Sequence, residues 1–206
     1  MEKRQSRREA VSEYKRALIL DAAKQIFAEE GLEGASLRAI AVRAGYTPAA
    51  LYFYFESKEA IYAEVLKASL AALGATVDQS VAQTRTAVQR LKAAAMGFFR
   101  FYVENPRDLD LGFYLFRGGM KPAGLGRERD EALNASLEAA LRPIADAASE
   151  LGASRQKANL LMVDCFAHAT GLLLLLHTGR IRMFGASASE RMEAYVKDRI
   201  AHLSES

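Results

Sequence analysis

This 206-residue chain places apolar residues three or four positions apart in almost every segment, which is the spacing of one face of an α-helix. Nowhere do apolar and polar residues alternate as they do in a half-buried strand. The pattern therefore predicts an all-α protein. Its clearest early stripe predicts a helix from about Tyr14 to Glu30, ended by Gly31. The apolar members of that stripe are Ile19, Ala22, Ala23, Ile26 and Phe27.

Two short helices with well-marked ends follow. Ser36 can cap a helix over 37–44, and Gly45 comes after that helix, where a left-handed residue is needed. Thr47 is a second capping residue, and Pro48 occupies the first helical position, where its missing N–H costs nothing. This second short helix is expected to end near Phe55. Two short helices joined by a tight glycine turn are the parts of a helix-turn-helix.

The second of these helices is expected to turn different side chains inward and outward. Leu51 and Phe55 are four residues apart, so they share the face that packs on the preceding helices. Small alanine side chains on the other face permit close approach to DNA, and a tyrosine hydroxyl can donate to a phosphate. Lys58, at the start of the next helix, adds a cation beside helix amides. The residues left to face outward are Thr47, Pro48, Ala49, Ala50, Tyr52, Phe53 and Tyr54.

Six further helices bring the predicted total to about nine. The first begins at Lys58, after the capping residue Ser57, and ends before Gly74. The others cover 84–104, 107–117, 127–150, 154–179 and 187–203, with loops at 118–126 and 178–189.

Composition indicates the cellular compartment of the protein and shows where its net charge lies. Half the residues are apolar and Cys165 is the one cysteine, so the chain can bury a core but cannot form an internal disulfide. The first twenty residues contain many charges where a signal peptide would need an unbroken apolar stretch. The apolar run Gly171–Leu176 is far shorter than the roughly 20 residues of a membrane span. We therefore expect a cytoplasmic protein with no membrane partner. The net charge of +3 equals the basic excess of residues 1–16 alone.

The segment 14–65, about a quarter of the chain, resembles the N-terminal domain of the tetracycline-repressor (TetR) family. The resemblance is carried by the stripe over 19–27, by the run from Gly31 to Ala41, and by the run from Ala44 to Glu59. The last run contains Leu-Tyr-x-x-Phe-x-x-Lys-Glu, with both glycines and the hydrophobic spacing in register.

This resemblance implies a DNA-binding transcriptional regulator in three parts. They are a basic flexible arm (1–13), a helix-turn-helix domain (14–57) and a helical effector-binding and dimerisation domain (58–206). A homodimer would bind a palindromic operator in double-stranded DNA, usually as a repressor, until a small-molecule effector releases it. By position, Tyr52 and Lys58 would contact phosphates, and Ser36 and Arg38 would approach from the first short helix. The base edges would meet Thr47, Pro48, Ala49 and Ala50.

The C-terminal part carries no family motif, and its two expected sites follow from composition. Facing helices of a bundle can enclose a pocket, here for an apolar or aromatic effector. The expected pocket residues are Phe98, Tyr102, Phe113, Tyr114, Phe116, Met162, Phe166 and His168. The last two predicted helices have more apolar surface than one chain should cover, which indicates a symmetric dimer contact. Its expected residues are Leu161, Phe166, Leu173, Leu176, Met192, Tyr195, Val196 and Ile200.

Two other functions compete with the regulator. Asp164, Cys165 and His168 lie within one helical turn, but they lack the further ligands of a zinc site, so no metal is expected. No cofactor motif and no acid-base set is found, which disfavours an enzyme acting on a small apolar substrate in the C-terminal part. A non-specific DNA architectural protein would need a widespread basic face, which the sequence lacks.

Overall fold

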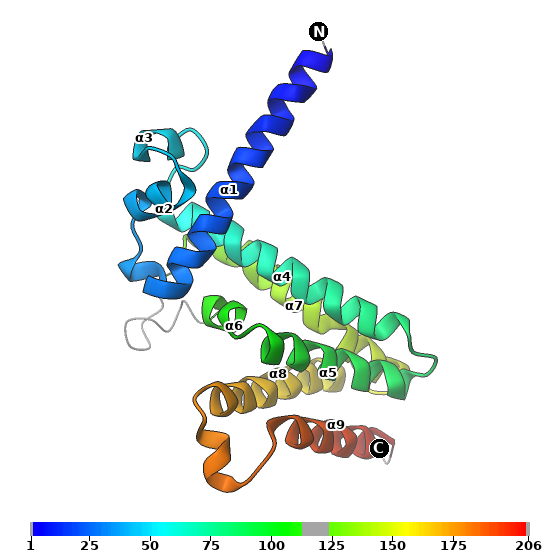
Figure 1. Cartoon of the computed structure of the whole chain (residues 1–206). Helices are drawn as coiled ribbons and strands as arrows, with labels where there is room; N and C mark the ends of the chain where they lie inside the picture. Colours follow the sequence, from blue (N-terminus) through cyan, green and yellow to red (C-terminus); the bar gives the residue numbers. More distant parts are fainter. Residues whose placement is uncertain (1, 113–123, 205–206) are drawn as a thin grey trace. The chain divides into compact units, whose positions relative to one another are not determined.

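The computed structural model of the chain describes residues 2–112 and 124–204, and all of its regular structure is helical (Figure 1). The described residues form nine α-helices and the 3-10 helix η2, and they contain no strand. The predicted all-α class is therefore confirmed.

The chain divides into two compact units, and α4 and α7 contribute residues to both. The first unit comprises the described part of 1–69 and 107–133, and the second comprises 70–106 and the described part of 134–206. The predicted boundary at residues 57 and 58 differs from this division. The physical reason is that α4 (Lys58–Ala82) is continuous, and its residues up to Ser69 pack with the first unit.

In the first unit, α1 (Glu2–Gly34) packs on α2 (Leu37–Ala44), and α2 packs on α3 (Pro48–Leu51). The core contains Ile19, Phe27, Ile40, Leu51 and Ile61, each fully buried. Burying large aliphatic and aromatic side chains contributes about 1.5–3 kcal/mol each, so this small core is what fixes the short helices in position.

Polar contacts attach α6 (Pro106–Gly112) to the same unit. Lys24 of α1 forms an ion pair with the buried carboxylate of Asp108, with 3.1 Å between Nζ and Oδ1. The hydroxyl of Tyr62 in α4 donates to the carbonyl of Leu111 over 2.8 Å. The Tyr62 ring also meets Phe27 edge to face, with 4.7 Å between ring centroids. Helix α6 is thereby tied to both α1 and α4.

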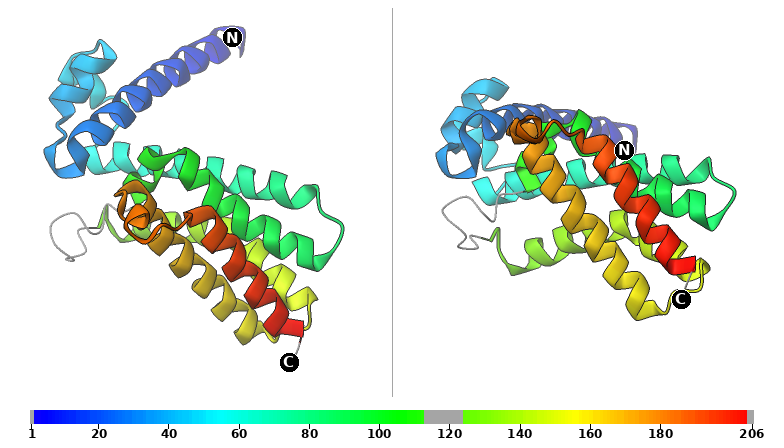
Figure 2. Two further views of the ribbon diagram at one scale, coloured as in Figure 1. Left: turned by 60° about the horizontal axis from the view of Figure 1, so that its bottom comes forward. Right: turned by 90° about the horizontal axis from the view of Figure 1, so that it is seen from below.

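The second unit contains α5 (Ala87–Glu104), α8 (Arg155–His177), η2 (Arg180–Phe184) and α9 (Ala188–Ser204), with parts of α4 and of α7 (Arg127–Glu150). Helices α8 and α9 lie side by side in both views of Figure 2. Helix α5 begins with a capping box between Thr86 and Gln89. Near its end, the carbonyl of Tyr102 lies 2.9 Å from Nε2 of His177, the last residue of α8, so this contact joins α5 to α8.

Several predicted boundaries are wrong. Helix α1 begins at Glu2, so the arm expected to be flexible over 1–13 is helical from residue 2, because its Glu, Lys, Arg and Ala residues favour a helix and nothing interrupts it. The predicted end at Gly31 is confirmed, because Gly31 has non-helical angles (φ +71°, ψ 177°) and α1 consists of two helical stretches that meet in a kink there. Helix α4, in contrast, continues through Gly74. Helix α5 begins three residues later than predicted, at Ala87, and the expected loop 178–189 contains η2. The helix predicted over 107–117 ends at Gly112, and 113–123 lie outside the described residues.

By length and composition alone, α4 and α8 are apolar enough to cross a membrane. Of their most apolar stretches, 44% and 33% respectively are buried within the chain. Core helices have the same composition, so this is weak evidence for a membrane protein.

Candidate nucleic-acid interface

Helix α2 and the turn after it are set by side-chain and glycine caps. Ser36 Oγ accepts a hydrogen bond from the Ala39 amide over 3.1 Å, as the capping prediction requires. Gly45 has φ +76°, and its amide donates to the Val42 carbonyl over 3.1 Å. The following Tyr46 amide donates to the carbonyl of Ala41 over 2.8 Å. Only glycine adopts this left-handed turn without steric cost, and the turn aims the chain into α3.

Helix α3 is shorter than predicted. Thr47 caps it by accepting from the Ala50 amide over 3.3 Å, and Pro48 takes the first helical position. The helix ends at Leu51, not near Phe55, and a tight turn follows in which the amides of Tyr54 and Phe55 both donate to the Leu51 carbonyl. This turn brings the Phe55 side chain back to the core.

The two residues predicted to face inward are buried, and five of the seven predicted to face outward are exposed. Leu51 is fully buried and Phe55 nearly so, while Tyr52 and Phe53 are 61% and 88% exposed. Ala50 and Tyr54 are half-buried. We call the exposed residues of this segment the outward face of α3; they are Thr47, Pro48, Ala49, Tyr52 and Phe53.

Arg16 of α1 holds the turn after α3, a role that the sequence did not reveal. Its Nη1 donates to the Tyr54 carbonyl over 3.0 Å, and its guanidinium lies over the Phe55 ring, 4.2 Å from the centroid. Its Nη2 also lies 3.5 Å from the carboxylate of Glu64 in α4. Arg16 therefore joins α1, the turn and α4.

The start of α4 is capped as predicted. Ser57 Oγ accepts from the Ala60 amide over 3.1 Å, and Lys58 is half-buried at the first position of the helix. Glu56, one residue before Ser57, forms an ion pair with Arg129 of α7. The short segment between α3 and α4 is thus fixed from two sides.

On α2, the two arginines differ in what they contact. Arg38 is exposed, as is the capping residue Ser36 just before the helix. Arg43 instead forms two hydrogen bonds to the carboxylate of Glu29 in α1, of 3.1 and 2.9 Å. These hydrogen bonds lower the pKa of Glu29. Arg38 is therefore the more available cation of the pair.

The structure brings together only some of the residues predicted to line the effector pocket. Phe98 meets Tyr102 and Phe166 edge to face, with centroid separations of 5.2 and 5.8 Å, and Met162 is buried. His168 stacks on Tyr195 of α9, with 3.9 Å between centroids. The predicted residues Phe113, Tyr114 and Phe116 lie outside the described residues.

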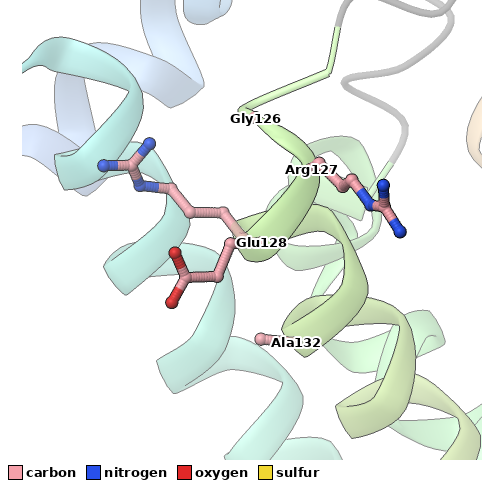
Figure 3. A pocket seen from close by; sticks show the side chains of 5 residues that line it. Gly126, Arg127, Glu128 and Ala132 are labelled. Atoms are coloured by element: carbon pink, nitrogen blue, oxygen red, sulfur yellow. The ribbon is translucent and has the colours of Figure 1, made fainter.

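A surface pocket of about 370 Å³ lies at the start of α7 (Figure 3). Its lining residues are Gly126, Arg127, Glu128, Arg129 and Ala132. The labelled Arg127 and Glu128 side chains point to different sides of the helix. None of the predicted effector residues belongs to this pocket.

Half of the predicted dimer contact needs correction. Leu161, Leu173, Met192 and Val196 are at most 6% exposed in the single chain, so they pack inside their own unit and cannot offer surface to a second copy. The other four, Phe166, Leu176, Tyr195 and Ile200, are half-buried. The apolar residues that α8 does expose are Leu160, Val163 and Leu174, at 56%, 54% and 53%.

The cysteine of α8 is buried, and its thiol is weakly acidic. Burial raises the pKa of the Cys165 thiol to about 12, so the thiol stays protonated near neutral pH and is a poor nucleophile. Among the residues that the structure describes, no three His, Cys, Asp or Glu side chains gather as a metal site would require.

Comparison with known proteins gives one family for the helix-turn-helix segment. Residues 19–65 match the family model of bacterial regulatory proteins, tetR family. The HTH-type transcriptional activator FasR of Mycolicibacterium smegmatis is 37% identical over 87 residues, which are 42% of this chain and 40% of FasR. The matched part thus spans well under two thirds of that relative.

Two solved structures extend the likeness to most of the chain. A TetR-like transcriptional regulator from Rhodococcus sp. RHA1 has a TM-score of 0.68 at 16% identity, over 91% of this chain and 96% of the other. FadR from Bacillus subtilis, solved in complex with stearoyl-CoA, has a TM-score of 0.67 at 17% identity, over 89% and 96%. At these identities the likeness concerns the fold.

Proposed function

Because the chain belongs to the tetR family of bacterial regulatory proteins, we propose that it is a DNA-binding transcriptional regulator whose α3 enters the major groove of an operator. The observation that carries the proposal is the outward face of α3. Its residues are exposed while Leu51 and Phe55 on the opposite side are buried. A short capped helix held in this way is the part of a helix-turn-helix that reads base edges.

The contacts around α3 divide into two kinds. Tyr52 and Lys58 bind phosphates, the first through its hydroxyl and the second through its charge at a helix start. Ser36 and Arg38 approach the backbone or the groove from α2. Thr47, Pro48, Ala49 and Ala50 face the bases; Ala50, being half-buried, contributes least. Phe53, whose role the sequence left open, joins the base-facing group because it is exposed and has no polar atom to offer a phosphate.

We propose that two copies associate through α8 and α9 and bind a palindromic operator. The support is the exposed apolar stripe of α8, whose Leu160, Val163 and Leu174 repeat at helical spacing. A symmetric four-helix contact would cover this stripe. Two α3 helices related by a dyad would meet half-sites one helical turn apart, about 34 to 36 Å for many dimers of this kind.

An effector bound in the second unit would act through α4. This helix carries Lys58 at one end and continues into the second unit at the other. In the first unit, α6 is joined to α1 by the Lys24–Asp108 ion pair and to α4 by the Tyr62 hydrogen bond. A displacement of α6 would therefore also move the two helices that support the DNA-binding residues. A coupling of about 1.4 kcal/mol between the two sites is enough for a tenfold loss of operator affinity.

We propose an apolar effector, taken up beside the aromatic cluster of Phe98, Tyr102 and Phe166. Long-chain acyl thioesters are one chemical class to test, since FadR was solved with stearoyl-CoA. Release by the effector implies repression. FasR, by contrast, is a transcriptional activator, so a promoter-reporter assay with and without the protein decides the direction of regulation.

Footprinting on DNA selected by the protein tests the function. We expect protection of one discrete palindrome, with no turnover of any bound small molecule. Diffuse protection along the fragment would instead favour an architectural protein, and turnover would favour the enzyme.

A further inference from the structure

The segment from Thr47 to Phe55 lacks the charged and amide side chains that commonly read bases in DNA. It contains no Asp, Glu, Lys, Arg, Asn, Gln or His. In the major groove, guanine is read by Arg or Lys, adenine by Asn or Gln, and cytosine by a carboxylate. The side chains that make these three hydrogen-bonded contacts are all missing from α3 and its following turn.

The hydroxyl groups of the segment are also largely committed. Thr47 Oγ1 already accepts from the Ala50 amide as the helix cap. The proposed function assigns the Tyr52 hydroxyl to a phosphate, and the Tyr54 side chain is half-buried. What remains exposed is apolar: the Pro48 ring, the Ala49 methyl and the Phe53 ring.

One base presents an apolar partner in the major groove, namely thymine, through its C5 methyl group. We infer that α3 reads its operator through thymine methyl groups contacted by Pro48, Ala49 and Phe53. This inference rests on the proposed function and specifies its target. Any direct reading of guanine would then come from the exposed Arg38 on α2, because Arg43 on the same helix is bound to Glu29.

Phe53 is the residue on which the inference depends most. It is 88% exposed and, unlike Tyr52, cannot donate a hydrogen bond. Its contact with DNA is therefore apolar, and the loss of the ring should matter only where a thymine methyl is present.

Replacing thymidine by deoxyuridine removes the C5 methyl group of the base and leaves base pairing unchanged. The experiment first selects an operator from a random DNA pool with the full chain. It then measures the affinity for that duplex with deoxyuridine at each thymine of both half-sites in turn. We expect one to three positions at which affinity falls about fourfold for each methyl group lost, the value of one buried methylene-sized contact.

Protein variants identify the side chain that contacts each methyl group. In Phe53→Ala, the preference for thymine over uracil should disappear at one position and persist at the others. Ala49→Gly, tested for a normal melting curve, should do the same at a different position. The matched control Arg38→Gln should weaken binding to both duplexes by the same factor, so that their ratio is unchanged.

The outcomes are distinguishable. If an operator is selected but deoxyuridine changes no affinity, the methyl-reading inference is wrong while the proposed function stands. Loss of the thymine preference in Arg38→Gln but not in Phe53→Ala would also overturn the inference. If no sequence is enriched, the proposed function itself fails, and the inference fails with it.

Discussion

Leu51 and Phe55 determine which side of α3 is available to DNA. Leu51 is buried in the helix, and Phe55 is turned back to the core by a turn that Arg16 holds through the Tyr54 carbonyl. With both anchored, Tyr52 and Phe53 between them have no place in the core and are exposed. The outward face is therefore a consequence of two apolar anchors and one arginine.

The anchors and the outward residues should respond differently to truncation. Leu51→Ala should lower the free energy of unfolding by about 2–5 kcal/mol, because it leaves a cavity in a small core. The matched variant Phe53→Ala, at an exposed neighbour, should change it by less than about 0.5 kcal/mol. Urea denaturation followed by circular dichroism measures both, and equal losses in the two variants would show that the assignment of faces is incorrect.

His168 should make stability depend on pH. It stacks on Tyr195, and its buried Nε2 has no hydrogen-bond partner among the described residues. Burial lowers the pKa of His168, outweighing the opposite effect of its hydrogen bond to the Arg191 backbone. The folded state thus binds fewer protons than the unfolded state, where the pKa is about 6.5, and stability falls as pH drops below that value.

The test compares wild type with His168→Gln, whose side chain does not titrate. Between pH 7 and pH 5.5, the free energy of unfolding should fall more in the wild type, while His177 and His202 contribute equally to both proteins. The same pH dependence in the two proteins would rule out this role.

At the scale of elements, the helices could be predicted where residues mark their ends. The bounds of α2 follow from Ser36 and Gly45, whose caps both form. The start of α1 could not be found, because its first residues favour a helix without forming an apolar stripe. The end of α3 was missed because Tyr52, Phe53 and Tyr54 include no helix breaker, although the chain must turn there to return Phe55 to the core.

Two glycines test the difference between a required and a tolerated glycine. Gly45 has φ +76°, whereas Gly74 lies inside α4, and an added Cβ would meet no atom within 4 Å at either site. Gly45→Ala should cost about 1–2 kcal/mol through backbone strain alone. Gly74→Ala should stabilise by about 0.5–1 kcal/mol. Thermal melts of both variants measure the effects, and the same sign in both would contradict the explanation.

At the scale of the molecule, the candidate dimer surface shows the limit of sequence reasoning. The run Leu172–Leu176 is apolar at every position, so periodicity cannot tell which leucines face inward. The predicted Leu173 is fully buried, and its neighbour Leu174 is exposed. In the same helix, the predicted Leu161 is buried, and the residue before it, Leu160, is exposed. Burial by neighbouring helices, which the sequence does not report, sets the register.

The double variant Leu160→Glu with Leu174→Glu should be monomeric, because two carboxylates would be buried without partners in the proposed contact. Val88→Glu is the matched control, since Val88 is a similarly exposed apolar residue on α5. Sedimentation velocity should give a dimer for wild type and for the control. A dimeric double variant would show that the contact lies elsewhere.

The most direct measurement is an anisotropy titration of a selected operator with wild type and Tyr52→Ala, each first shown to have the same melting curve. Tyr52 is exposed, so its removal should leave the fold intact and delete a hydrogen bond to a charged phosphate. We predict an affinity at least about tenfold lower for the variant. Equal affinity of the two folded proteins would contradict binding of DNA by the outward face of α3.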